Sequence, residues 1–140
     1  MTLRQPTQHP LSGITGTPTI ARTLVDEKVN RIGMEAVKAL DSKPHGFFST
    51  DIKEDASGNS VVTEVDGKWH TTAPLWGYAF AKVLNKPELN LTDQYLTLAL
   101  NGTAEADLPH FNLFPNNYYL IRQIDAGVIL EHDDKPWRII

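Results

Sequence analysis

The sequence predicts a mainly β protein of the α+β class: a small antiparallel β-barrel or sandwich with one N-terminal helix and an extended N-terminal arm. From residue 46 onward, roughly six to eight short alternating or β-branched segments are separated by turn residues at regular intervals. One apolar stripe with helical spacing precedes them. With 140 residues, we expect a single β-rich domain over 20–140, preceded by an arm over 1–19.

Composition and charge exclude several classes of function. The net charge is −4 with both signs interspersed, which argues against nucleic-acid or anionic-membrane partners because these need a basic face. The chain has no cysteine, so disulfides, thiolate catalysis and zinc–thiolate sites are excluded. The N-terminus lacks the apolar core of a signal peptide, and no run approaches the roughly 18 apolar residues of a membrane span. We therefore expect synthesis in the cytoplasm.

The arm, Met1–Thr19, is rich in proline, glycine and threonine and has no hydrophobic period. Two interpretations stay open: the arm packs on its own domain, or a neighbouring chain holds it, as in coat and assembly proteins. The second interpretation makes the arm's larger side chains candidates for an interface. These candidates are Leu3, Pro6, His9, Leu11 and Ile14.

A helix is predicted at about 20–41, because apolar residues recur there at spacings of three and four. The stripe consists of Ala21, Val25, Val29, Ile32, Ala36 and Leu40. Thr17 and Pro18 would supply the cap and the first turn. Gly33 in the middle costs about 1 kcal/mol, so this helix needs tertiary support.

Period-two patterns follow the helix. Gly46–Ile52 and the β-branched Ser60–Val65 are predicted strands, joined by a turn at Asp55–Asn59. Asp66-Gly67 then predicts a tight turn that leads into a returning strand at Lys68–His70.

The segment Pro74–Leu84 allows two structures. As a helix it would align Trp76 with Phe80, and as a strand it would place Trp76, Tyr78 and Phe80 on one face. The alternation of large and small residues and the internal Gly77 favour the strand.

The C-terminal half is predicted to consist of hairpins. Tyr95–Leu100 alternates and is followed by Asn101-Gly102, a strong hairpin signal, with Thr103–Leu108 returning. The loop Pro109–Asn117 is unusually apolar, so we add Phe111, Leu113 and Phe114 to the interface candidates. The remaining strands are Tyr118–Ile124, Val128–Glu131 and Trp137–Ile140, with turns at Asp125–Gly127 and His132–Pro136.

No catalytic, metal or cofactor-binding motif is present. The histidines lack the local spacing of metal ligands. His132-Asp133-Asp134 could form a general base or part of a metal site, but a solvated turn is the favoured interpretation. His70, His110 and His132 could meet in space as a three-histidine site, with Asp133 or Asp134 orienting a base, although nothing in the sequence requires it.

A resemblance suggests a function. The text from Trp76 reads WGYAFAKVL, a glycine- and alanine-containing strand, and LTDQYLTLALNGTAEADL follows as an alternating strand and turn. This resembles the small β-barrel decoration, or cement, proteins of tailed bacteriophage capsids, and the hairpin in Tyr118–Ile140 fits the same style. The resemblance implies a homo-oligomer clamped on the major capsid protein at the virion surface by its arm, without catalytic residues.

We therefore expect a structural virion protein that cements a capsid through its arm and apolar faces, with no cofactor. The alternatives are a small β-barrel enzyme and a ligand-binding module that use convergent histidines.

Overall fold

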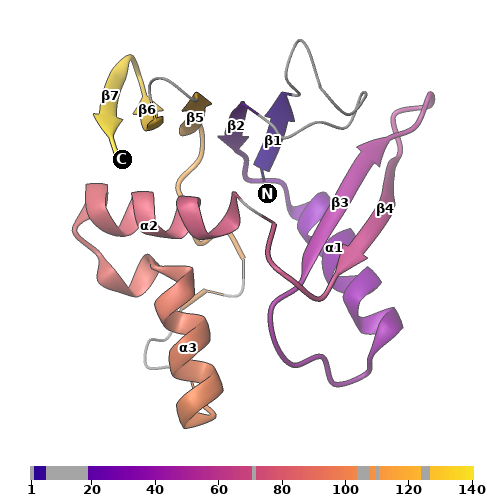
Figure 1. Ribbon diagram of the computed structural model, residues 1–140. Helices are drawn as coiled ribbons and strands as arrows, with labels where there is room; N and C mark the ends of the chain where they lie inside the picture. The colour runs from indigo at the N-terminus through magenta and orange to yellow at the C-terminus, as the bar shows by residue number, and fades with distance from the viewer. Residues whose placement is uncertain (1, 6–18, 71, 104–107, 110, 124–126) are drawn as a thin grey trace.

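A computed structural model describes residues 2–5, 19–70, 72–103, 108–109, 111–123 and 127–140. In these residues the chain forms two antiparallel sheets and three α-helices (Figure 1). The predicted α+β class is confirmed. No closed barrel is found within the described ranges, because the strands form an open sheet and a separate hairpin. None of the helices in these ranges has the length and apolarity needed to cross a membrane.

The larger sheet has five antiparallel strands in the order β1-β2-β5-β6-β7. They are β1 (Thr2–Gln5), β2 (Ile20–Thr23), β5 (Tyr119–Gln123), β6 (Gly127–His132) and β7 (Lys135–Arg138). Ala21, Leu120 and Leu130 lie opposite one another on successive strands and are buried. Side chains of one strand alternate between the two faces, so this row defines the core face of the sheet.

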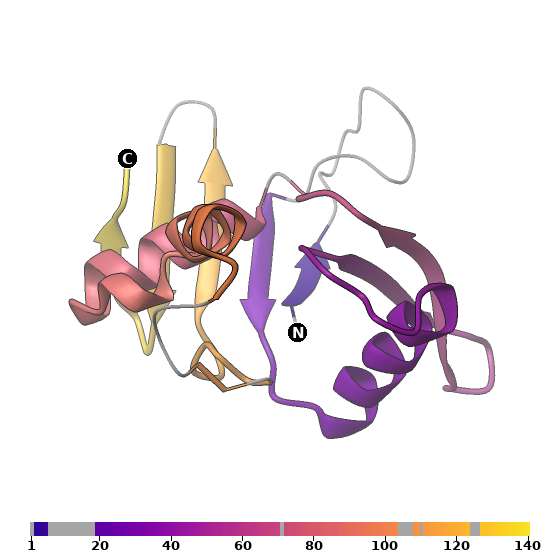
Figure 2. The same cartoon turned by 90° about the horizontal axis from the view of Figure 1, so that it is seen from below.

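Helix α2 (Ala73–Leu84) covers that core face, and α3 (Leu91–Asn101) lies beyond it on the same side (Figures 1 and 2). The short 3-10 helix η1 (Pro87–Leu89) joins them. The buried core consists of Ala21, Trp76, Ala79, Phe80, Leu89, Leu120, Val128, Leu130 and Ile139. The Nζ of Lys82 donates to the carbonyl of Ile139 at 2.9 Å and ties the C-terminal segment to α2.

The second unit is a hairpin of β3 (Ser49–Glu54) and β4 (Ser60–Asp66), on which α1 (Glu27–Leu40) packs. The turn between the strands is held by Asp55, whose carboxylate accepts from the backbone N–H groups of Ser57 and Asn59. The predicted turn and the predicted strand over Ser60–Val65 are confirmed.

The predicted helix over 20–41 begins too early. The first residues of that range form β2, and the helix starts at Glu27 after Asp26, whose carboxylate accepts from the N–H of Val29 at 3.0 Å. Ala21 and Thr23 are buried in the sheet. The apolar stripe ran through a strand and a helix and concealed the boundary between them.

The predicted strand over Pro74–Leu84 is wrong, because the segment is helix α2. Helical spacing stacks Trp76 on Phe80 with 5.6 Å between ring centroids. Gly77 lies against the next segment, where a Cβ atom would come within 2.6 Å of the backbone nitrogen of Leu91. The glycine therefore serves close packing of helices rather than a strand.

The predicted hairpin over 95–108 is also wrong. Residues 91–101 form α3, with Asn90 as the N-cap accepting from the N–H of Thr92. Gly102, with φ of 71°, caps the C-terminus instead of turning a hairpin. Residues 104–107 lie outside the described ranges.

No strand returns after Asp66-Gly67, which corrects the predicted turn into Lys68–His70. The chain instead runs from β4 into α2, and His70 folds back on Asp66. At the other end of the chain, the predicted turn between β6 and β7 is confirmed. Asp133 and Asp134 both have positive φ, as a two-residue hairpin turn requires.

Of the predicted arm, residues 2–5 and 19 lie in the described ranges. Thr2–Gln5 form β1, which pairs with β2 of the same chain at the edge of the sheet. Leu3 belongs to this strand. Residues 6–18 lie outside the described ranges, and so do the candidates Pro6, His9, Leu11 and Ile14.

Candidate functional site

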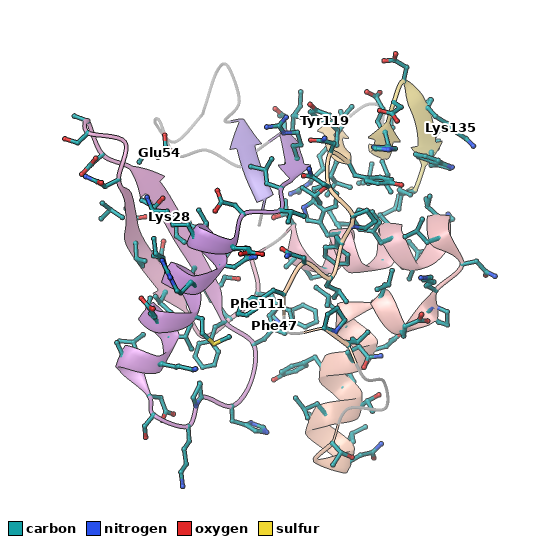
Figure 3. The ribbon with its side chains drawn as sticks, turned by 180° about the vertical axis from the view of Figure 1, so that it is seen from behind. Lys28, Phe47, Glu54, Phe111, Tyr119 and Lys135 are labelled. Carbon is teal, nitrogen blue, oxygen red and sulfur yellow. The ribbon has the colours of Figure 1, made fainter. Side chains whose placement is uncertain are left out.

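A cleft of about 1100 Å³ separates the hairpin unit from the helices and the larger sheet. One wall comes from β3 and the first half of α1, and the other from the start of α2 and the loop 111–114. In Figure 3 Lys28 and Glu54 lie on the hairpin side, and Phe47 and Phe111 lie between the two halves. We regard this cleft as the candidate functional site.

The hairpin presents the edge of β3 to the cleft. All residues of β3, from Ser49 to Glu54, line the cleft, whereas of β4 only Ser60 does. Successive side chains of a strand point to opposite faces of the sheet. A strand whose successive residues all line a cleft therefore presents its edge, and not one of its faces, to the cleft. Within the described residues β3 pairs only with β4. The backbone groups on its other side therefore face the cleft.

The direction of these groups follows from the hairpin turn. Asp55 donates its N–H to the carbonyl of Asn59 across the hairpin at 2.9 Å. Backbone groups of an antiparallel strand point alternately toward and away from the partner strand. The N–H groups of Glu54 and Ile52 therefore point away from β4, on the regular side of the bulge between Asp51 and Ile52.

The opposite wall is aromatic and firmly held. Phe114 stacks on the buried Phe80 with 4.6 Å between ring centroids. The hydroxyl of Thr23 donates to the carbonyl of Pro115 at 2.6 Å and accepts from the N–H of Tyr118 at 3.0 Å. These bonds anchor the loop to β2, so this wall is formed before any ligand arrives.

Two further contacts shape the cleft. The amide of Asn30 on α1 donates to the side-chain oxygen of Asn112 at 2.8 Å and links the two walls. The indole Nε1 of Trp76 is buried and has no hydrogen-bond partner in the described residues. A buried donor without an acceptor costs about 1–3 kcal/mol, so a ligand carbonyl that reached it would be stabilised.

His70 lies on the cleft between two carboxylates. Its Nε2 is 2.9 Å from Asp66 and its Nδ1 is 3.8 Å from Asp51. The hydrogen bond from His70, helped by the charge of Lys68, lowers the pKa of Asp66 below its usual value. The arrangement keeps Asp66 ionised and orients the imidazole at the base of β3.

An aromatic cluster fixes the segment before His70. Trp69 contacts Phe47 and Tyr95, with ring centroids 4.7 and 5.4 Å apart. The cluster joins the segment before the hairpin to α3, and its member Phe47 lines the cleft.

The three histidines weighed as a site are not brought together by the described structure. His70 lies on the cleft, whereas His132 stacks on Tyr118 at 4.1 Å, bonds the carbonyl of Asn117 and lies 3.2 Å from Asp133. His110 lies outside the described ranges. No group of three or more His, Asp or Glu side chains in those ranges is arranged to hold a metal ion.

The interface candidates of the apolar loop have different environments. Phe114 and Leu113 pack against the core, so their apolar character is largely explained within the chain. Phe111 is 43% exposed and lines the cleft. It is the member of this group best placed to contact another molecule.

Sequence reasoning missed the residues that define the cleft. The sequence predicts Asp66 in a turn, although its spacing of four from His70 is a usable signal for a contact. Asp51 comes from the neighbouring strand, and nothing local in the sequence connects it with His70. The free edge of β3 depends on strand pairing and had no signal of its own.

Comparisons with known protein families, curated proteins and solved structures found no significant match.

Proposed function

We propose that this chain is a non-catalytic assembly protein that captures an extended segment of a partner polypeptide in its cleft. The segment adds to the free edge of β3 as a third strand of the hairpin sheet. Strand addition is a common mode of peptide recognition, in which main-chain hydrogen bonds supply affinity and side-chain pockets supply specificity.

One observation carries this proposal: all six residues of β3 line the cleft, and among the described strands only β4 pairs with β3. Exposed strand edges are liabilities that proteins usually cover or shorten. Here the edge is six residues long and faces a cleft large enough to receive a chain. An extended peptide would form hydrogen bonds with more of the backbone groups along this edge than a compact ligand would.

The chemistry of the walls limits the peptide. Phe47, Trp76 and Phe111 line the cleft and favour an apolar or aromatic side chain at that end. The hairpin over 49–66 carries five carboxylates, from aspartate and glutamate, and one lysine. Its local net charge of −4, five negative charges against one positive charge, favours a basic peptide.

The biological setting follows from the resemblance to capsid decoration proteins. In that setting the captured segment belongs to the major capsid protein, and the chain acts on the virion surface after synthesis in the cytoplasm. Capture of a partner strand would serve the predicted cementing function, with the arm and apolar faces as further contacts. The small β-barrel implied by the same resemblance stays a prediction.

A second candidate is a small-molecule or catalytic function of the same cleft. The observation that favours it is the 2.9 Å contact between His70 and Asp66, a geometry in which a carboxylate orients an imidazole base. The second carboxylate, Asp51, faces the other ring nitrogen at 3.8 Å. This geometry suits a fixed, polar corner of a binding site better than a base with one nitrogen free.

The proposal is tested with a fluorescein-labelled hexapeptide of alternating valine and lysine, and with a valine–glutamate peptide as the charge control. We expect saturable binding of the lysine peptide and weaker binding of the glutamate peptide, measured by fluorescence anisotropy. Glu54→Pro removes an N–H that points to the free edge, and it should weaken binding about tenfold because a ladder bond is lost. Glu54→Ala removes the same charge but keeps the N–H, and it should bind the lysine peptide nearly as wild type does.

Equal binding by Glu54→Pro and Glu54→Ala, with both variants folded by circular dichroism, would contradict strand addition. If neither peptide binds saturably, the cleft is not a strand receptor. Binding that is unaffected by Glu54→Pro and abolished by His70→Ala would favour the small-molecule alternative.

A further inference from the structure

The face of the larger sheet that points away from α2 carries an ordered pattern of side chains. Strand register places Ile20, Ile121 and Ile129 in one row across β2, β5 and β6. The next row contains Arg22, Tyr119 and Glu131. These residues alternate with the buried row of the core, so they lie on the opposite face.

This outer face is not covered by any helix or strand of the described chain. In Figure 3 Tyr119 lies on the side of the sheet remote from α2, and it is 36% exposed. The three isoleucines are half-buried. A row of three branched apolar side chains on an uncovered sheet face is a typical protein interaction surface.

In the row of Tyr119, two side chains of opposite charge flank β5. Arg22 lies on one side of Tyr119 and Glu131 on the other, because β2 and β6 are the two neighbours of β5. The same polarity continues in a hollow of about 380 Å³ lined by these three residues together with Asp133 and Asp134. Within the row of Tyr119, the β2 side is therefore basic and the β6 side acidic, whereas Arg138 of β7 continues the isoleucine row beyond Ile129.

We infer that the outer face binds a second copy of this chain about a two-fold axis parallel to β5. Such an axis, placed between two facing sheets, carries β2 of one copy onto β6 of the other. Neighbouring strands are about 4.8 Å apart and facing sheets about 10 Å apart. Arg22 of each copy then faces Glu131 of the other, and each Ile20 faces an Ile129.

A second copy fits the face better than an unrelated partner does because the pattern is self-complementary. A two-fold interface brings the same patch of both copies together, so each charge must meet its opposite at the symmetric position. Arg22 and Glu131 satisfy this condition. Tyr119 and Ile121 lie on the axis, where each contacts the same residue of the other copy. This inference does not depend on the cleft or on its peptide.

Charge reversal tests the inference on the full chain. Arg22→Glu and Glu131→Arg each place like charges opposite one another, and each should weaken the dimer at least about a hundredfold in sedimentation equilibrium. An equimolar mixture of the two variants should form a heterodimer, because both of its cross-pairs are again of opposite sign. The double variant should dimerise like wild type. Lys43→Glu, in an exposed loop after α1, is the matched charge control and should leave the dimer unchanged.

A second measurement keeps the inference testable if a charge variant folds poorly. The chain has no cysteine, so a single introduced cysteine is the only thiol that a cross-linker can join between two copies. Facing sheets are about 10 Å apart, beyond the Cα separation of a disulfide, and a short bismaleimide must therefore bridge the pair. Tyr119→Cys, on the axis, should cross-link efficiently, and Tyr78→Cys, on the exposed side of α2, should not.

A monomeric wild type at several hundred micromolar would overturn the inference. So would a dimer that both charge reversals leave intact, or cross-linking of Tyr78→Cys in place of Tyr119→Cys. Peptide binding in the cleft can succeed or fail independently of each of these outcomes.

Discussion

Two of the helices contain a glycine near the middle, and replacing each glycine with alanine should change stability in opposite directions. A Cβ atom at Gly33 of α1 would meet nothing closer than Ile52 and Thr50, at 3.9 Å. This is an ordinary van der Waals distance. Gly33→Ala should therefore gain the full helix propensity of alanine and raise the free energy of unfolding by about 1 kcal/mol.

Gly77 of α2 has a different environment. A Cβ atom there would lie 2.6 Å from the backbone nitrogen of Leu91 and 3.0 Å from the carbonyl oxygen of Leu89. Backbone atoms cannot rotate away, so the junction with α3 must shift. Overpacking costs about 1–3 kcal/mol, and contact with backbone puts this site at the upper end. After the gain in propensity of about 1 kcal/mol, Gly77→Ala should lower the free energy of unfolding by about 2 kcal/mol.

Urea denaturation followed by tryptophan fluorescence measures both variants against wild type. The two should differ by about 3 kcal/mol, with each glycine as the control for the other. A Gly77→Ala protein as stable as wild type would refute the close packing of α2 on the segment that begins α3. A loss of stability in Gly33→Ala would refute the spacing between α1 and the hairpin.

Three further predictions concern single interactions. The pKa of Asp66 is lowered mainly by its hydrogen bond to His70. The resulting stability is present at pH values above the usual aspartate pKa of about 3.9, and it is lost as the pH falls through the lowered pKa. Unfolding of wild type between pH 5 and 3 should therefore depend on pH more steeply than that of Asp66→Asn. Asp26→Ala should lower the free energy of unfolding by about 1 kcal/mol through loss of the α1 cap, while Asp26→Ser should retain most of it. Phe114→Ala should lower it by about 3 kcal/mol, near the lower end of the range for a buried phenylalanine, and an unchanged urea midpoint would show that this ring does not pack in the core.

Turn chemistry predicted two hairpins correctly and failed at Asp66-Gly67 and Asn101-Gly102. Local side-chain effects on the backbone made three elements predictable: the turn at Asp55–Asn59, the strand after it and the C-terminal hairpin. The carboxylate of Asp55 holds its own turn, and Asp133 and Asp134 adopt positive φ.

Helices α2 and α3 were not predicted because their large apolar residues also alternate with smaller or polar ones, as in a strand. Leu96 and Leu100 of α3 alternate in sequence as a strand would, yet they are 51% and 83% exposed on a helix. The hairpin signal Asn101-Gly102 was a helix C-cap, since both structures use a glycine with positive φ. Only the cap at Asn90 and the spacing of Trp76 and Phe80 favoured helices.

The candidate site was less predictable than the fold. His70 was singled out from the sequence and the β3–β4 hairpin was predicted, but no local pattern showed that the chain after Asp66 brings His70 beside Asp51. The other lining of this cleft comes from α1, the start of α2 and the loop 111–114, so the environment of the β3 edge depends on segments far apart in the sequence.

The most direct test of the proposed function is an NMR titration of the labelled protein with the valine–lysine hexapeptide. The account predicts that the backbone amides of Ile52 and Glu54 shift most, with cross-strand nuclear Overhauser effects from the peptide to β3, while amides of β4 facing away from the cleft stay near their starting positions. Shifts confined to the aromatic wall, with the β3 amides unchanged, would contradict capture of a strand at this edge.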